Sequence, residues 1–120
     1  MTIKTYLGFD VGTKRTGIAI ANSLTSHASG IETVIHHKDG STNWSQLEKL
    51  INKHQADIFV VGLPLDDKGK DQEMTFIARS FGRKLEQRFS KEVVFIDEYL
   101  SSSEAKNQLK WHYAHKNADR

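Results

Sequence analysis

The chain has 120 residues and a formal net charge of +2, with 38% hydrophobic and 27% charged residues. This balance predicts one globular domain, residues 1–120, and excludes a disordered protein. The absence of cysteine excludes disulfides and thiolate metal sites, and it fits a reducing cytoplasm. No apolar stretch reaches the roughly 20 residues of a membrane span, and the first residues lack a signal-peptide pattern. We therefore expect a cytoplasmic protein with no membrane partner.

The first half of the chain is predicted to form three strands and a helix. Apolar runs predict strands at 3–10, 16–21 and 31–36, and a tight turn at 11–15 joins the first two strands into a hairpin. Asn43 and Gln46 form a capping pair at the start of a helix. Apolar residues at helical spacing follow within that helix: Trp44, Leu47, Leu50 and Ile51.

The second half alternates strands and helices. Residues 57–62 are so uniformly apolar that both faces of this strand must be covered. A polar loop at 66–70 precedes a long helix, and a strand at 93–96 follows it. A capping box at residues 101 and 104 begins a last helix that runs to about residue 110. The buried side of the long helix is predicted to consist of Met74, Ile77, Ala78, Phe81, Leu85 and Phe89.

The element order βββαβαβα predicts an α/β protein with a mixed central sheet. Strands that are joined through helices pair in parallel, with right-handed crossovers. The first strand is then expected near the centre, with helices on both faces, as in the ribonuclease H-like fold. The carboxyl ends of the first strand and the last two strands share one edge in this arrangement, which brings together Asp10, Gly62, Asp97 and Glu98.

Acidic residues end two of the predicted strands. Asp10 ends the first strand, and Asp97 and Glu98 end the last one. Carboxylate oxygens are the ligands that hard cations such as magnesium require. Only one acid of the adjacent pair can face Asp10, because side chains alternate along a strand. Two unrelated surface acids are the alternative.

Three segments resemble the YqgF family, also called RuvX, whose members are bacterial ribonuclease H-like proteins. The segments read GFDVGTKRTGIA at 8–19, VVGLPL at 60–65 and DEYLS at 97–101. Their order and spacing fit the family from the N-terminus to about residue 109. Older descriptions of the family name Holliday junction resolvases, and more recent ones name nucleases for the 5′ end of pre-16S ribosomal RNA.

The resemblance implies metal-dependent hydrolysis of phosphodiester bonds in structured RNA, most simply in the 5′-end processing of pre-16S rRNA during ribosome biogenesis. The implied cofactor is Mg²⁺ or Mn²⁺, as two ions, and a pre-ribosomal 30S particle is a candidate partner. The implied catalytic and metal-binding residues are Asp10, Glu98 and Asp119, with Glu98 favoured over Asp97.

The resemblance weakens near the end of the sequence. Relatives usually place an aspartate at the start of a further helix, whereas here only Asp119 stands near the matching position. Tyr99 stands where the family commonly has arginine. We therefore expect weak metal binding by the isolated chain, and slow cleavage unless RNA or a partner orders this segment.

The remaining residues near the expected site have assigned and alternative roles. Lys14 and Arg15 are expected to hold a substrate phosphate, although a basic hairpin tip without function is the alternative. Ser102 is expected to donate to a phosphate at a helix N-terminus. Structural roles near the site are expected for Gly12, Gly62, Pro64 and Asp97.

Three other functions stay open from the sequence. A Holliday junction resolvase would use the same metal chemistry on four-way DNA, as a two-fold dimer. A catalytically weak RNA-binding or ribosome-assembly module would keep the fold without a complete metal site. An actin-like or sugar-kinase phosphotransferase also opens with an Asp-x-Gly-Thr hairpin, but it needs a second domain around the nucleotide. The sequence does not predict the oligomeric state.

Overall fold

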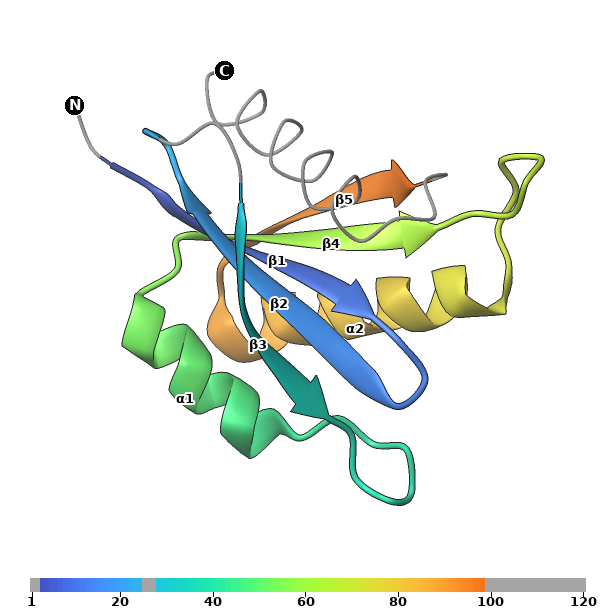
Figure 1. The fold of residues 1–120 in the computed structure, drawn as a ribbon, viewed down its shortest axis with the longest axis horizontal. Helices are drawn as coiled ribbons and strands as arrows, with labels where there is room; N and C mark the ends of the chain where they lie inside the picture. Colours follow the sequence, from blue (N-terminus) through green and yellow to red (C-terminus); the bar gives the residue numbers. More distant parts are fainter. Residues whose placement is uncertain (1–2, 25–27, 99–120) are drawn as a thin grey trace.

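The computed structural model describes residues 3–24 and 28–98. Their elements follow the predicted order as far as the described chain extends (Figure 1). The predicted last helix, at 101–110, lies outside the described residues. The elements are β1 (Thr5–Val11), β2 (Arg15–Asn22), β3 (Ser29–Ile35), α1 (Trp44–His54), β4 (Ile58–Pro64), α2 (Glu73–Phe89) and β5 (Glu92–Glu98).

The five strands form one mixed sheet with the order β3-β2-β1-β4-β5, and β1 lies at its centre as predicted. β2 pairs antiparallel with both β1 and β3, whereas β4 pairs in parallel with both β1 and β5. The arrowheads of β1, β4 and β5 therefore point to the same edge of the sheet (Figure 1). This edge carries Asp10, Gly62 and the two acids of β5.

One face of the sheet carries the larger core, to which both described helices contribute. Phe9 is completely buried in this core, and its ring centroid lies 5.7 Å from that of Phe59 and 5.5 Å from that of Phe81. The helices contribute Leu47, Leu50 and Ile51 from α1 and Ala78, Phe81 and Leu85 from α2. Both described helices thus lie on one face, and the expectation of helices on both faces stays a prediction.

The opposite face of the sheet carries a smaller buried cluster around β4. It contains Ile58 and Val60 of β4, with Tyr6, Ala21 and Ile96 from the neighbouring strands. The side chains of β4 thus alternate between two buried faces, which confirms the prediction for this strand. Neither described helix has the length and apolar character that a membrane span needs.

The start of α1 confirms the predicted cap, because the Gln46 backbone N–H donates to Asn43 Oδ1 at 3.2 Å. The prediction of which α2 residues are buried was only partly right. Ala78, Phe81 and Leu85 are buried, but Ile77 is 40% exposed and Thr75 is completely buried instead. The Thr75 hydroxyl donates to the Pro64 carbonyl and accepts from the Gln72 N–H at 3.0 Å, so the first turn of α2 is fixed to the end of β4 by polar contacts.

Candidate active site

Asp10 lies near the end of the central strand, on the face opposite to α1 and α2. Leu7, Phe9 and Val11 belong to the helix-side core, so the alternation of β1 places Asp10 on the other face. Its partner across β2 is Gly17, and the two residues help to line a depression of about 300 Å³. Gly17, directly opposite Asp10 on β2, contributes no side chain beside the half-buried carboxylate.

Glu98 lies on the same face of the sheet as Asp10, and Asp97 lies on the other. Glu98 and the buried Ile96 are two residues apart on β5, and Ile96 belongs to the cluster opposite the helices. Glu98 is buried, with 2% of its surface exposed, whereas Asp97 is exposed. The alternation of β5 therefore makes Glu98 the member of the pair that shares a face with Asp10.

Strand register places Asp10 and Glu98 near each other along the edge, but not side by side. Val61 of β4 pairs with Phe9 on one side and with Phe95 on the other, so Asp10 lies level with Gly62. Glu98 lies two residues farther along β5. With strands about 4.8 Å apart and a rise of about 3.3 Å per residue, the two Cα atoms are about 12 Å apart. Gly62 stands between them on β4 and contributes no side chain to the space.

The two carboxylates fit the donor chemistry of a hard divalent cation, which takes oxygen ligands. Within residues 3–24 and 28–98, no group of three or more histidine or acidic side chains lies close enough together to hold a metal ion. Two of the three acids that were predicted to be ligands, Asp10 and Glu98, lie in the described chain. The third, Asp119, lies outside the described residues, as do Ser102 and Tyr99.

The hairpin between β1 and β2 presents two basic residues beside Asp10. Lys14 and Arg15 are exposed, and neither forms an ion pair within the described residues. Arg15 is two residues from Gly17 on β2, so it lies on the same face as Asp10. The tip is tight, since the Gly12 N–H donates to the Arg15 carbonyl at 2.9 Å. A Cβ on Gly12 would lie 2.7 Å from that carbonyl oxygen, so close approach requires this glycine, not a positive φ.

A second hollow lies at the same edge of the sheet, on its helix side. It has a volume of about 390 Å³, and its charged or titratable lining consists of His36 and Lys84 without any acid. Phe76 and Ile77 line it and are 58% and 40% exposed. The hollow was not predicted, because the helical pattern places Ile77 in the core. One signal was available in the sequence: Phe76 and Ile77 are adjacent apolar residues, and the buried side of a helix needs only one of them.

The basic residues of α2 are largely engaged with aromatic rings. The guanidinium of Arg88 lies 4.3 Å from the Trp44 ring centroid, and that of Arg83 lies 5.9 Å from Phe95. Arg79 lies 5.9 Å from Phe76 and also contacts Asp71 at 3.4 Å. These contacts give the three arginines structural partners, and Lys84 is the basic residue of α2 that faces a hollow.

A mixed five-stranded sheet with carboxylates on one face, at the ends of its central strand and of β5, is the arrangement of ribonuclease H-like α/β proteins. Residues 4–120 match the RuvX family, described as Holliday junction resolvase, and the chain belongs to this family. The resemblance that the sequence motifs indicated is thereby confirmed.

Several curated relatives cover most of the chain. One from Aeromonas salmonicida is 44% identical over 109 residues, which are 91% of this chain and 77% of the relative. One from Shewanella oneidensis is 42% identical with the same coverage, and one from Coxiella burnetii is 41% identical over 85% of this chain and 72% of its own. Each is named "Putative pre-16S rRNA nuclease".

Among solved structures, the Pelota protein of Thermoplasma acidophilum is similar, with a TM-score of 0.52 and 14% identity. The similarity covers 84% of this chain and 30% of Pelota. At this identity it indicates a likeness of fold alone.

Proposed function

We propose that this protein is a metal-dependent nuclease that hydrolyses phosphodiester bonds in structured RNA, and that it processes the 5′ end of pre-16S rRNA on a pre-ribosomal 30S particle. The observation that carries the proposal is the shared face of Asp10 and Glu98 at the carboxyl edge of parallel strands. The names of the curated relatives support the choice of RNA substrate.

The proposed ligands of Mg²⁺ or Mn²⁺ are the carboxylates of Asp10 and Glu98, with Asp119 as the third. The bound ions would supply activation of water and stabilisation of the leaving oxygen. Asp10 is suited to hold its position because β1 pairs with strands on both sides. Arg15 lies on the same face, and we propose that it binds a phosphate next to the one that is cleaved.

The small residues around Asp10 serve the same proposal. Three of the residues that line the depression beside the carboxylate, Gly17, Ala19 and Gly30, do not project far from the sheet, and its other lining residues are Ile18, Ile31, Glu32 and Thr33. A sugar-phosphate backbone can therefore approach this face closely. The basic hairpin tip and the acid-free hollow beside Lys84 add favourable surface for a polyanion along the same edge.

Four-way DNA is the second candidate substrate, because the RuvX family is described as Holliday junction resolvase. It requires the same phosphodiester chemistry, but two symmetric cuts require two sites in a two-fold dimer. A third candidate, an RNA-binding assembly module with weak or no cleavage, follows if the two described carboxylates do not suffice.

One experiment separates these candidates. The purified protein is incubated with 5′-extended 16S precursor RNA and with a synthetic four-way junction, in Mg²⁺, in Mn²⁺ and in chelator, beside the Asp10→Asn variant. We expect cleavage of the RNA that chelator and the variant both abolish. Cleavage of the junction alone would favour the second candidate, RNA binding without cleavage would favour the third, and cleavage in chelator would overturn the metal mechanism.

A further inference from the structure

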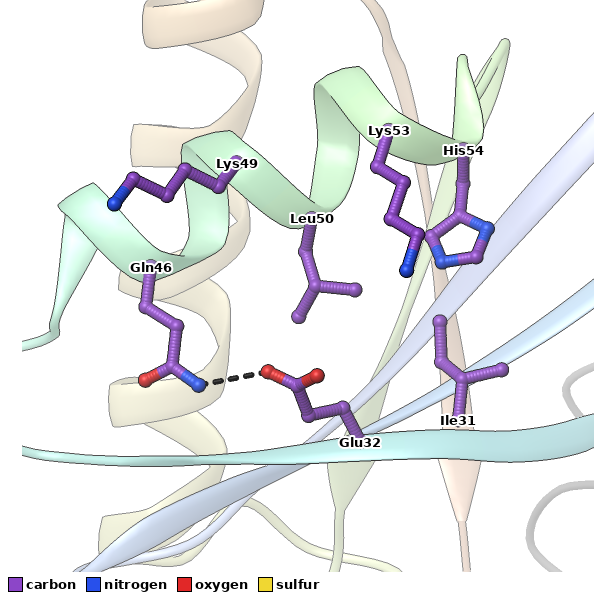
Figure 2. Close-up of a pocket in the computed structure, with 7 residues that line it drawn as sticks. All are labelled: Ile31, Glu32, Gln46, Lys49, Leu50, Lys53 and His54. Atoms are coloured by element: carbon purple, nitrogen blue, oxygen red, sulfur yellow. Dashed lines mark hydrogen bonds between the residues drawn. The ribbon is translucent and has the colours of Figure 1, made fainter.

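The outer side of β3 is a sheet edge that no described strand covers, and it lies next to a groove. β3 is the end strand of the sheet, and no other strand pairs with its outer side in the described part of the chain. The groove lies between β3 and α1, has a volume of about 420 Å³, and is shown in Figure 2. Ile31 and Glu32 line it from the strand, and Gln46, Lys49, Leu50, Lys53 and His54 line it from the helix.

A β-bulge directs the strand toward this groove. Glu32 pairs with Ile18, and Gly30 pairs with the next residue of β2, Ala19, so Ile31 is the extra residue. A bulge turns a side chain away from its regular alternation, and here the consecutive residues Ile31 and Glu32 both line the groove. The residues after the bulge, 32–35, pair regularly with β2.

The groove combines an apolar floor with excess positive charge. Ile31 and Leu50 supply the apolar part, and Figure 2 shows the Lys53 and His54 side chains on the helix side of the opening. Glu32 is the one acid among the lining residues, and its Oε2 accepts a hydrogen bond from Gln46 Nε2 at 2.7 Å. Lys49 and Lys53 are exposed, one turn apart on α1, and neither forms an ion pair within the described residues.

We propose that the groove between β3 and α1 binds an extended acidic peptide of a partner protein, which adds a sixth strand beside β3. Backbone groups of the peptide would pair with the open edge. Every second side chain would enter the groove, where an aliphatic residue fits Ile31 and Leu50 and carboxylates fit Lys49 and Lys53. The proposal does not rest on the proposed nuclease function, although Ile31 and Glu32 also help to line the depression beside Asp10.

The described residues favour this occupant over two others. A second copy of the chain, paired edge to edge about a two-fold axis, would bring two lysine-bearing α1 helices to the same side of the joined sheet, where like charges repel. A single-stranded RNA would need stacking surfaces, and His54 is the only ring among the groove-lining residues. An extended peptide uses both features that the groove offers, the strand edge and the positive charge.

The test uses the full chain and fluorescently labelled synthetic peptides in which every second residue is in turn valine or glutamate, with threonine at the positions between them, so that both kinds of side chain face the groove. Fluorescence anisotropy should show saturable binding. A peptide with lysine in place of glutamate should bind at least about tenfold more weakly, and so should an acidic peptide N-methylated at alternate residues. The first control tests charge, and the second tests backbone pairing with charge unchanged.

Protein variants localise the binding. The double charge reversal Lys49→Glu with Lys53→Glu should weaken binding of the acidic peptide at least about tenfold, whereas Lys68→Glu, at an exposed lysine in the loop between β4 and α2, should leave it within about twofold. Amide chemical shifts of β3 should change on titration, and melting temperatures should show that each variant is folded. Absence of saturable binding, equal binding of the N-methylated peptide, or full binding by the double variant would overturn the proposal. If the double variant instead lost only RNA binding, or only the ability to form a dimer, the groove would bind RNA or a second copy of the chain, and the proposal would be wrong.

Discussion

At the carboxyl edge of the sheet, the two faces carry different kinds of side chain, although the same strands supply both. On the helix side, β1 contributes Leu7, Phe9 and Val11 to an aromatic core. On the other side, near the carboxyl edge, the same strand contributes Asp10, next to Gly17 and level with Gly62. The alternation of one strand thus separates stabilisation from chemistry, so that a change on one face should leave the property of the other largely intact.

The largest effect is expected from Asp10→Asn, which tests the chemical face. The amide keeps the shape of the carboxylate but removes the charge that would hold a divalent ion, so cleavage should fall by at least about 100-fold. The midpoint of urea unfolding should shift little, because Asp10 is outside both buried clusters. Retained divalent-dependent cleavage by the purified variant would contradict the assignment of this residue.

The next largest effect is expected from Phe59→Ala, which tests the core on the helix side of the sheet. Phe59 is completely buried, and its ring lies 5.7 Å from Phe9 and 5.9 Å from Phe89. Removal of the ring should lower the free energy of unfolding by about 3–5 kcal/mol, measured by urea titration. The matched control is Phe76→Ala, because Phe76 is 58% exposed and should cost less than about 1 kcal/mol. Equal losses from the two variants would contradict the assigned core.

The sequence predicts the parts of the fold that depend on local patterns, and it misses those that depend on contacts between distant residues. Strands and helices followed from periodicity, which is local. Thr75 and Ile77 were missed because the rotation of α2 depends on the Thr75–Pro64 hydrogen bond, a contact across 11 residues that no helical pattern contains. The extra residue Ile31 in β3 was missed for a similar reason, since a bulge is defined only by its pairing with β2.

The candidate site was predictable to the level of residue type and strand end. Asp10 and Glu98 stand out in the sequence as acids after apolar runs. The observed β5 is longer than predicted, Glu92–Glu98 instead of 93–96, so both acids belong to the strand and its alternation assigns their faces. The offset of two residues between Asp10 and Glu98 depends on the register of three strands, which the sequence does not encode locally.

Glu98 and Asp97 offer a comparison of the two faces at adjacent positions. Glu98→Gln should weaken Mn²⁺ binding about tenfold or more in titration calorimetry, because it removes a charged ligand on the face of Asp10. Asp97→Asn, an exposed change on the other face, should alter the affinity less than about threefold. The reverse order of effects would mean that Asp97 is the ligand and that β5 departs from its regular alternation when metal binds.

A smaller effect, on stability, is expected at the start of α1, which packs on the helix side of the sheet. Asn43→Ala removes the acceptor of the Gln46 N–H and should lower the free energy of unfolding by about 1 kcal/mol. Asn43→Ser is the matched control, because serine also caps helices and should recover most of the loss. Circular dichroism during urea unfolding gives both values. An unchanged midpoint for Asn43→Ala would show that the observed cap contributes nothing to stability.

The smallest effect is expected at Asp39, which lies outside both faces, in the loop between β3 and α1. Its Oδ1 accepts hydrogen bonds from the Ser41 hydroxyl at 2.6 Å and the Ser41 N–H at 2.9 Å, and these bonds hold the pKa of the carboxyl below its usual value of 3.8. Because the pKa is lowered in the folded state, the stabilisation is present above 3.8 and is lost as the pH falls toward the folded-state pKa. The group is fully exposed, so the contribution is small. The free energy of unfolding, measured by urea titration, should fall between pH 6 and pH 3 by slightly less for Asp39→Asn than for the unchanged protein. A larger fall for the variant would contradict the stated direction of the pKa shift.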